Sequence, residues 1–355
     1  MLFGNLRFIC LEIACPVLKH VIVCSSGDLG NWKLNNFVKT ILMNKKDIKI
    51  IFWGSSEFSV PSLLTLIKEF NVVGVIAETS KQSGRGHEVK TPRTIEIAKE
   101  HGIKTFQVEN FGEDFSDELK ELKPDLNLTC SYGKLIPDKV LNLPTHGSIN
   151  VHPSLLPKYR GCAPIQGALL NGDSKTGVSI ILMDSELDSG DIIATRKEAI
   201  TESDNFTTLC KRLSLISAEM LKTVVPEYIN DEVNYITQED EYATYIKKIE
   251  KKDGLINWNT PVLNISNLIR AFNEWPVAYT FYKEKKLEIK KANPTRIANA
   301  GAHTVGEVIE RDKKYYVRCK SGYLELLSVK LEGKNEVDIK SFVNGHQDLV
   351  GSILS

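Results

Sequence analysis

An amide, an imidazole and a carboxylate occur in this sequence at spacings that could bring them to one reacting group. Asn150 and His152 lie two residues apart at the end of an apolar run, residues 147–151, that is typical of a short buried strand. Side chains two apart in a strand point to the same face. Asp188 follows a second apolar run, residues 177–183, where a carboxylate could orient the imidazole and favour its charged form. From residue types alone, turn, cap and core roles remain the alternative.

Four segments surround these residues in a fixed order: residues 147–161, 163–166, 176–178 and 187–191. Together they resemble the folate-dependent formyltransferases, and within that superfamily the branch whose acceptor is methionyl-tRNA. The likeness runs from about residue 48 to residue 346, which is nearly everything except an N-terminal extension.

The resemblance implies a reaction in which an amine attacks a formyl carbon while negative charge builds on the formyl oxygen. Asn150 and His152 would donate to that oxygen, and Asp188 would keep the proton on His152 and help to deprotonate the amine. It also implies 10-formyltetrahydrofolate as the donor and co-substrate, with no metal. The folate contacts that it implies are Ser154, Leu155, Leu156, Pro157, Tyr132, Gly133, Lys134 and Leu135.

Two basic clusters are candidates for RNA binding. The loop at residues 79–93 is similar to the insertion with which tRNA formyltransferases grasp the acceptor stem, although a basic loop is otherwise simply solvated. The second cluster lies near the C-terminus and could hold RNA backbone. The predicted tRNA-binding residues are Lys81, Arg85, Lys90, Arg93, Lys285, Lys286, Lys290 and Lys291, and the predicted partner is initiator methionyl-tRNA.

Apolar runs alternate with helical stretches in the first part of the chain, which predicts an α/β domain with a Rossmann-like, mostly parallel sheet. The strands are expected at residues 48–53, 72–77, 125–130, 148–151 and 177–183. The helices are expected at residues 61–69, 92–100 and 206–228.

Short β-like runs follow a charged segment in the last third of the chain, and they predict a small OB-like barrel. The runs are residues 276–282, 286–291, 304–311, 315–320 and 323–329. The resulting division is an extension (1–46), a catalytic domain (47–229), a linker with a helical portion (230–252) and a C-terminal tRNA-binding domain (253–355).

Composition narrows the class of protein. The 355 residues carry 45 basic and 45 acidic side chains, so RNA contact has to come from local patches rather than from net charge. The seven cysteines form no C-x-x-C pair, which favours a reducing compartment over a disulfide or zinc framework. We expect a cytoplasmic monomer without membrane contact.

The first 46 residues differ in character from the rest. The apolar stretch at residues 8–24 is too short and too charged to span a membrane, and it lacks the parts of a secretory signal. We expect translation to start at Met43, with an organellar targeting peptide as the alternative.

Two other functions stay open at the level of sequence. One is formylation of a small amine, such as a purine-pathway ribonucleotide or an amino sugar nucleotide. Pro153 and Cys162 favour it slightly, because many tRNA-formylating members carry glycine and alanine there. The other is a noncatalytic RNA-binding protein on this scaffold.

Overall fold

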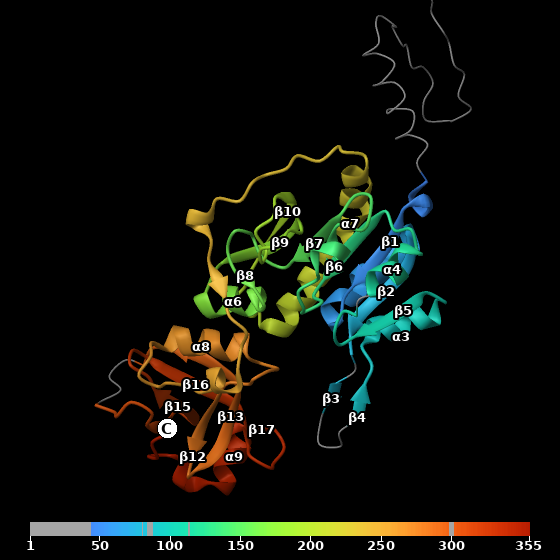
Figure 1. The fold of residues 1–355 in the computed structure, drawn as a ribbon. Helices are drawn as coiled ribbons and strands as arrows, with labels where there is room; N and C mark the ends of the chain where they lie inside the picture. The colour runs from blue at the N-terminus through green and yellow to red at the C-terminus, as the bar shows by residue number, and fades with distance from the viewer. Residues whose placement is uncertain (1–43, 80, 84–87, 113, 298–301) are drawn as a thin grey trace, which may run out of the picture. The chain divides into compact units, whose positions relative to one another are not determined.

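The computed structural model of the chain describes residues 44–355, apart from residues 80, 84–87, 113 and 298–301 (Figure 1). The expectations for the N-terminal extension, including the start at Met43, and for Arg85 fall outside the described residues.

A seven-stranded sheet forms the first domain, and five of its strands are parallel. The order across the sheet is β10-β9-β7-β6-β1-β2-β5, with β9 antiparallel to β7 and β10 antiparallel to β9. The strands are β1 (Lys49–Trp53), β2 (Asn71–Glu78), β5 (Lys104–Val108), β6 (Leu126–Cys130), β7 (Ser148–His152), β9 (Lys175–Leu182) and β10 (Ile192–Ala199). The predicted mostly parallel α/β sheet is therefore confirmed.

Within this sheet, the sequence pattern missed two strands, β5 and β10, and these are its two edges. An edge strand is paired on one side only and is less completely covered, and β5 accordingly has just one buried residue, Val108. Without a continuous apolar run, neither segment carries the pattern by which the interior strands were recognised.

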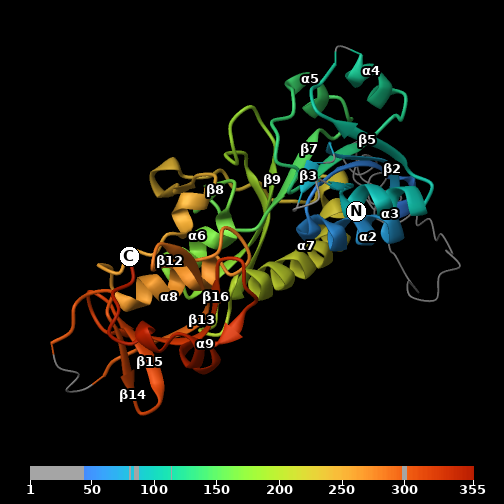
Figure 2. The same cartoon turned by 90° about the horizontal axis from the view of Figure 1, so that it is seen from below.

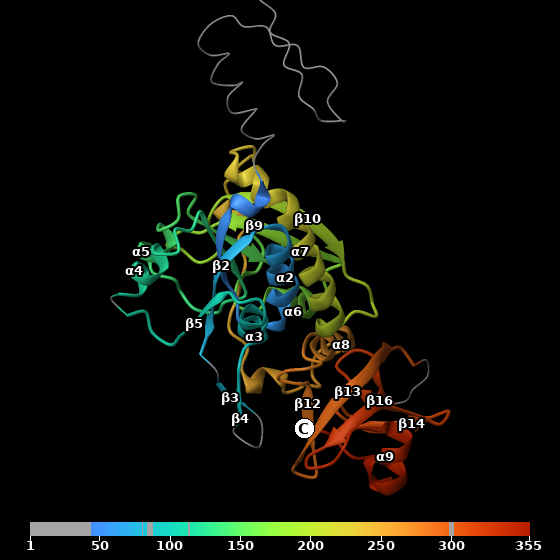
Figure 3. The same cartoon turned by 90° about the vertical axis from the view of Figure 1, so that its right-hand side faces the viewer.

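Helices cover both faces of the sheet (Figures 2 and 3). One face carries α2 (Val60–Glu69), α3 (Arg93–Glu100) and α7 (Phe206–Ile229), and the other carries α4 (Phe115–Lys120) and α5 (Asp138–Leu141). The long helix α7 starts at a capping box, in which the Asn205 side chain accepts from the Thr208 main chain and the Thr208 hydroxyl accepts from the Asn205 main chain. The three predicted helices, α2, α3 and α7, agree with the structure to within one residue at each end, whereas α4 and α5 were not predicted.

The direction of the chain reverses between β1 and β6, which is the topological switch point of the sheet. In open α/β sheets, ligands bind outside the carboxyl ends of the strands at such a point. The loops that follow β1 and β6 meet there: Ser55 N donates to Ser131 O at 3.2 Å, and Ser56 Oγ donates to Ser131 Oγ at 2.8 Å. Asn150 and His152, at the end of β7, lie on the same edge of the sheet.

The C-terminal part is a curled antiparallel sheet, a half-barrel in place of a closed barrel. Its strands are β12 (Tyr279–Tyr282), β13 (Lys285–Thr295), β14 (Val308–Arg311), β15 (Lys314–Arg318), β16 (Tyr323–Leu331) and β17 (Val337–Asp338). Helices α8 (Val262–Ala271) and α9 (Ile339–Gly345) contribute to its core, in which Trp258 and Leu287 are buried.

The segment predicted as a linker with a helical portion contains two short 3₁₀ turns, Asp240–Tyr242 and Lys251–Gly254, and no α-helix. Between them, β11 (Tyr245–Ile246) pairs in parallel with β8 (Arg160–Gly161). A side chain on residue 161 would bring its Cβ to within 2.5 Å of the Ile246 carbonyl oxygen, so this pairing requires glycine. The segment is therefore a strap held against the first domain.

Candidate active site

The structure brings Asn150, His152 and Asp188 together. Asn150 Nδ2 donates to Asp188 Oδ1 at 3.3 Å, and His152 Nδ1 lies 3.6 Å from Asp188 Oδ2. The His152 and Asp188 side chains are only 5% and 9% exposed, so their interaction is little screened by water. Period-two alternation in β7 and the turn after β9 thus produce the predicted convergence.

Asp188 is held from a third direction by the main chain. Its Oδ2 accepts from Gly161 N at 2.8 Å, and the residue itself adopts a left-handed conformation with φ of 55°. An ionised carboxylate can accept from Asn150, His152 and Gly161 at once, which a protonated acid cannot do equally well.

His152 faces an acceptor with each ring nitrogen. Nε2 lies 2.9 Å from the main-chain oxygen of Tyr159, and Nδ1 faces Asp188. A carbonyl oxygen can only accept, so this contact is a hydrogen bond in the tautomer that carries its proton on Nε2. No sequence signal points to the Tyr159 carbonyl, because any residue provides one.

The predicted folate segment at residues 154–157 divides into two kinds of residue. Ser154 and Leu156 are buried: Ser154 Oγ donates to Lys158 O at 2.6 Å, and Leu156 packs with Ile181 and Ile192. Leu155 and Pro157 are half-buried. Only the second pair therefore presents side-chain surface on which a ligand could lie.

Tyr132 lies in the loop that follows β6. Its ring packs edge-on against Trp53, with 5.2 Å between centroids, and among the described residues its buried hydroxyl has no hydrogen-bond partner. Burial, reinforced by the negative charge of Glu78, raises the pKa of Tyr132 to about 12. The hydroxyl is thus a neutral donor available to a ligand.

The next three residues have different environments. Gly133 has a φ of 89°, a backbone conformation that favours glycine. Lys134 Nζ donates to the main-chain oxygens of Val108 and Glu109 at 2.9 and 2.7 Å. Leu135 is 79% exposed and offers an apolar surface.

The basic loop is a hairpin that follows β2, the strand next to β1 (Figure 3). Strands β3 (Lys81–Ser83) and β4 (Glu88–Lys90) pair antiparallel, with Lys81 opposite Lys90. Arg93 lies beyond it at the start of α3, where its guanidinium bonds Glu96 at 2.8 Å and Glu100 at 3.1 Å. Two carboxylates therefore compete with any phosphate for Arg93.

The predicted C-terminal lysines also differ in environment. Lys285 and Lys291 are exposed. Lys290 Nζ donates to Asn273 O at 3.3 Å, and Lys286 lies 4.5 Å from the centre of the Tyr279 ring.

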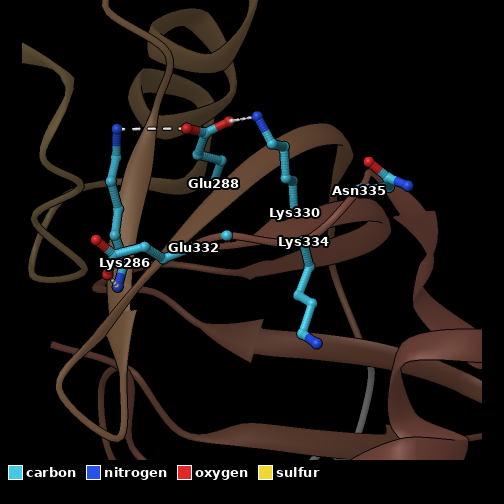
Figure 4. A pocket seen from close by; sticks show the side chains of 7 residues that line it. Lys286, Glu288, Lys330, Glu332, Lys334 and Asn335 are labelled. Atoms are coloured by element: carbon cyan, nitrogen blue, oxygen red, sulfur yellow. Dashed lines mark hydrogen bonds and ion pairs between the residues drawn. The ribbon is translucent and has the colours of Figure 1, made fainter. Parts of the chain in front are cut away.

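Lys286 also lines a hollow of about 410 Å³ (Figure 4). There Glu288 lies between two lysines, 3.4 Å from Lys286 and 3.7 Å from Lys330, whereas the Lys334 side chain points away from this group. The hollow is consequently mixed in charge rather than a basic patch.

No group of three or more potential metal ligands occurs among the residues that the structure describes. Nor does any helix in the described ranges have the length and apolar character needed to cross a bilayer.

Two family models match the chain. Residues 48–225 match the formyl transferase model, and residues 248–347 match the model of the formyl transferase C-terminal domain. The segments that contain Asn150, His152 and Asp188 all fall within the first match.

Solved structures with a similar fold include two that hold a bound folate. HypX from Aquifex aeolicus in complex with tetrahydrofolic acid aligns over 85% of this chain and 48% of its own, with a TM-score of 0.56 and 16% identity. An N-formyltransferase from Helicobacter canadensis, in complex with folinic acid and dTDP-3-aminofucose, aligns over 79% of this chain and 98% of its own, with a TM-score of 0.59 and 20% identity. At these identities the likeness establishes the fold alone.

Sequence relatives are closer. The methionyl-tRNA formyltransferase of Caldanaerobacter subterraneus subsp. tengcongensis is 39% identical over 310 residues, 86% of this chain and 100% of that protein. The methionyl-tRNA formyltransferase of Ruminiclostridium cellulolyticum is 36% identical over 84% of this chain and 97% of that protein. With this identity over nearly the whole length of its relatives, the chain belongs to the methionyl-tRNA formyltransferase family.

Proposed function

We propose that this protein transfers a formyl group from 10-formyltetrahydrofolate to the amino group of methionine on initiator tRNA, for translation initiation. The convergence of Asn150, His152 and Asp188 at the switch-point edge of the sheet is the observation that carries the proposal. The identity to methionyl-tRNA formyltransferases over 86% of the chain supports the choice of acceptor. A reaction on aminoacyl-tRNA belongs in a compartment where translation takes place, which we take to be the cytoplasm.

The residues around the trio suit a folate. A pterin ring is flat and carries polar edges, so it needs apolar walls and a few placed donors. Leu135, Leu155 and Pro157 would supply apolar surface, and the Tyr132 hydroxyl is a buried donor without a partner in the described part of the chain. When bound, 10-formyltetrahydrofolate supplies the formyl group.

Asn150 and His152 act on the formyl oxygen in this proposal. As the amine nitrogen forms its bond to the formyl carbon, charge develops on that oxygen, and donors aimed there are each worth roughly 2.7–4 kcal/mol. The second amide hydrogen of Asn150 can serve while the first remains on Asp188. His152 has to exchange one of its two present acceptors for the formyl oxygen.

Asp188 is the proposed proton acceptor and donor. Its carboxylate accepts the proton that the attacking amine loses, directly or through water. The proton then goes to the folate nitrogen as the carbon–nitrogen bond to the formyl group breaks. The products are N-formylmethionyl-tRNA and tetrahydrofolate, so atoms and charge balance without a further co-reactant.

The β3–β4 hairpin would contact the tRNA acceptor end. It follows β2 at the carboxyl edge of the sheet, and Lys81, Arg85 and Lys90 would give it positive charge suited to phosphates. Arg93, Lys286 and Lys290 would add less, because each already has a partner within the protein.

The test offers purified protein and 10-formyltetrahydrofolate four acceptors in parallel: methionyl initiator tRNA, methionyl elongator tRNA, an amino sugar nucleotide and a purine-pathway ribonucleotide. We expect formylation of the initiator tRNA with a kcat/KM well above that of the others. Preferred formylation of a small amine would overturn the acceptor, and tight tRNA binding without any formyl transfer would support the noncatalytic alternative.

A further inference from the structure

We infer that Gln238, a residue of the strap between the two domains, is a positioning residue for Asp188. Gln238 is 8% exposed, and both the oxygen and the nitrogen of its side-chain amide form hydrogen bonds within the protein. Its Nε2 donates to the main-chain oxygens of Asp188 at 2.9 Å and Gly190 at 2.7 Å. These two carbonyls flank Ser189 in the turn that presents the Asp188 carboxylate.

The turn needs such support because its backbone is not intrinsically stable. Asp188 adopts a φ of 55°, which a side chain other than glycine tolerates at a cost. Gln238 fixes two carbonyl directions of this turn at once, so it selects the conformation that aims the carboxylate at Asn150 and His152.

Arg160 in turn fixes Gln238. Its guanidinium donates through Nε at 3.1 Å and Nη2 at 3.0 Å to Gln238 Oε1, which determines the direction of the amide and leaves its NH2 group facing the turn. Arg160 is itself 2% exposed, and Asp240 and Tyr245 of the same strap hold its outer side at 2.9 and 3.2 Å.

Arg160 also lies between the two residues whose main chains touch the trio. The oxygen of Tyr159 faces His152, and the nitrogen of Gly161 donates to Asp188. Strap residue Thr244 secures this stretch, because Tyr159 N donates to Thr244 Oγ1 and Arg160 N donates to Thr244 O, at 2.9 and 2.8 Å. The Arg160–Gln238 pair therefore holds the main chain that contacts His152 and Asp188, without touching either of those side chains.

This inference rests on the proposed function, since it concerns how the same site is kept in order. The experiment compares four proteins in the initiator-tRNA assay: wild type, Gln238→Met, Asp188→Asn and the double variant. Methionine keeps the length of glutamine and removes the hydrogen bonds. We expect Gln238→Met to lower kcat by ~10- to 100-fold, since small misplacements of a catalytic group cost this much, with the KM of both substrates nearly unchanged.

The double variant separates positioning from a general structural role. If Gln238 acts through Asp188, the two losses are not additive, and Gln238→Met adds little once Asp188 is asparagine. Independent, multiplied losses, or an unchanged kcat in Gln238→Met, would overturn the inference. Glu239→Met, on the neighbouring exposed residue of the strap, is the matched control and should behave as wild type.

The design also covers a variant that does not fold and a wild type that is inactive. If Gln238→Met does not fold, Gln238→Glu replaces it: the carboxylate still accepts from Arg160 but opposes the carbonyls of Asp188 and Gly190, and the same fall in kcat is expected. If wild type does not formylate any acceptor, the proposed function fails, whatever the role of Gln238. If wild type is active and Asp188→Asn keeps full activity, the proposed function stands and the role of Gln238 through Asp188 is overturned.

Discussion

At the scale of single residues, the site is an arrangement around one carboxylate. Asp188 accepts from the neutral amide of Asn150 at 3.3 Å and from a main-chain nitrogen at 2.8 Å, and its carboxylate lies 3.6 Å from the imidazole nitrogen of His152. The amide and the imidazole are the proposed donors to the formyl oxygen, so one acidic residue aligns both and is itself the proposed proton acceptor. A change to the carboxylate should consequently impair the proposed functions of all three side chains.

Replacing Asp188 with asparagine is expected to lower kcat by two to three orders of magnitude, of the order of the ~2.7–4 kcal/mol lost with one such group. Asn150→Ala and His152→Ala should fall in the same range, and all three should unfold near the wild-type temperature. Steady-state kinetics with methionyl-tRNA and circular dichroism measure the two properties. Glu186→Gln, an exposed carboxylate on the same turn, should have normal kinetics. Near-normal turnover of a trio variant would remove that residue from the mechanism.

At the scale of elements, the start of α7 is stabilised by the buried carboxylate of Asp204. It accepts from Thr201 N at 2.8 Å, Thr208 Oγ1 at 2.9 Å and Arg212 Nη2 at 3.0 Å. Burial alone raises the pKa of Asp204, but the hydrogen bonds from Arg212 and Thr201 outweigh it and hold the pKa well below its usual range. Arg270 of α8 donates to the main-chain oxygen of the same residue at 3.1 Å, so this turn also ties α8 to α7.

Asp204→Asn should lower the free energy of unfolding at neutral pH by roughly 2–3 kcal/mol, somewhat less than for a fully buried pair because the Arg212 side chain is 36% exposed. A depressed pKa stabilises the fold above the unfolded-state value, about 3.9, and that stabilisation is lost as pH falls towards the folded-state value. Urea unfolding at several pH values should therefore show the gap between wild type and variant shrinking below about pH 4. Glu202→Gln, on the exposed neighbour, should leave no such gap. A difference that stays constant with pH would contradict the ionic role.

At the scale of the whole molecule, zero formal net charge means that RNA affinity has to come from where cations are placed. The β3–β4 hairpin and the C-terminal lysines are the two candidates. Within the second group the structure separates the exposed Lys285 and Lys291 from Lys286 and Lys290, which have partners.

The triple variant Lys81→Ala, Arg85→Ala, Lys90→Ala is expected to raise the KM for tRNA at least tenfold and to leave the KM for folate unchanged. Each lost phosphate contact should also flatten the dependence of log affinity on log salt by about 0.7–0.9. A salt titration of tRNA binding measures this slope. Lys120, Lys123 and Lys139, exposed near α4 and α5, give a control with the same change in net charge. Parallel slopes for wild type and the hairpin variant would show that the hairpin is merely solvated.

The pairs of C-terminal lysines provide a second comparison. Lys285→Ala with Lys291→Ala should weaken tRNA binding and reduce its salt dependence, because exposed ammonium groups release counterions on binding. Lys286→Ala with Lys290→Ala should have the smaller effect on binding, since those side chains are held by Glu288, Tyr279 and Asn273. Filter binding at two salt concentrations distinguishes them, and the reverse order would place the RNA on the side of the charged hollow.

The sequence by itself determined the interior strands, the long helices and the convergence of Asn150, His152 and Asp188, the proposed catalytic trio. Interior strands are recognisable because burial on both faces demands continuous apolar residues, and Asn150 and His152 share a face because strands alternate. The chemistry and the choice of acceptor came from the family likeness rather than from any periodicity. The edge strands β5 and β10 were not predicted, because a partly exposed strand lacks the continuous apolar run by which strands are recognised.

Only the tertiary structure decided how the strap and the loops combine. Residues 230–252 have the composition of a linker, yet β11 pairs with β8 and Gln238 bonds the Asp188 turn. Those contacts join residues 50 or more positions apart, chiefly through main-chain carbonyls, which every residue type provides equally. Local sequence does not indicate which carbonyl a buried amide will contact. The hydrogen bonds by which the strap supports the site are therefore determined only by the tertiary structure.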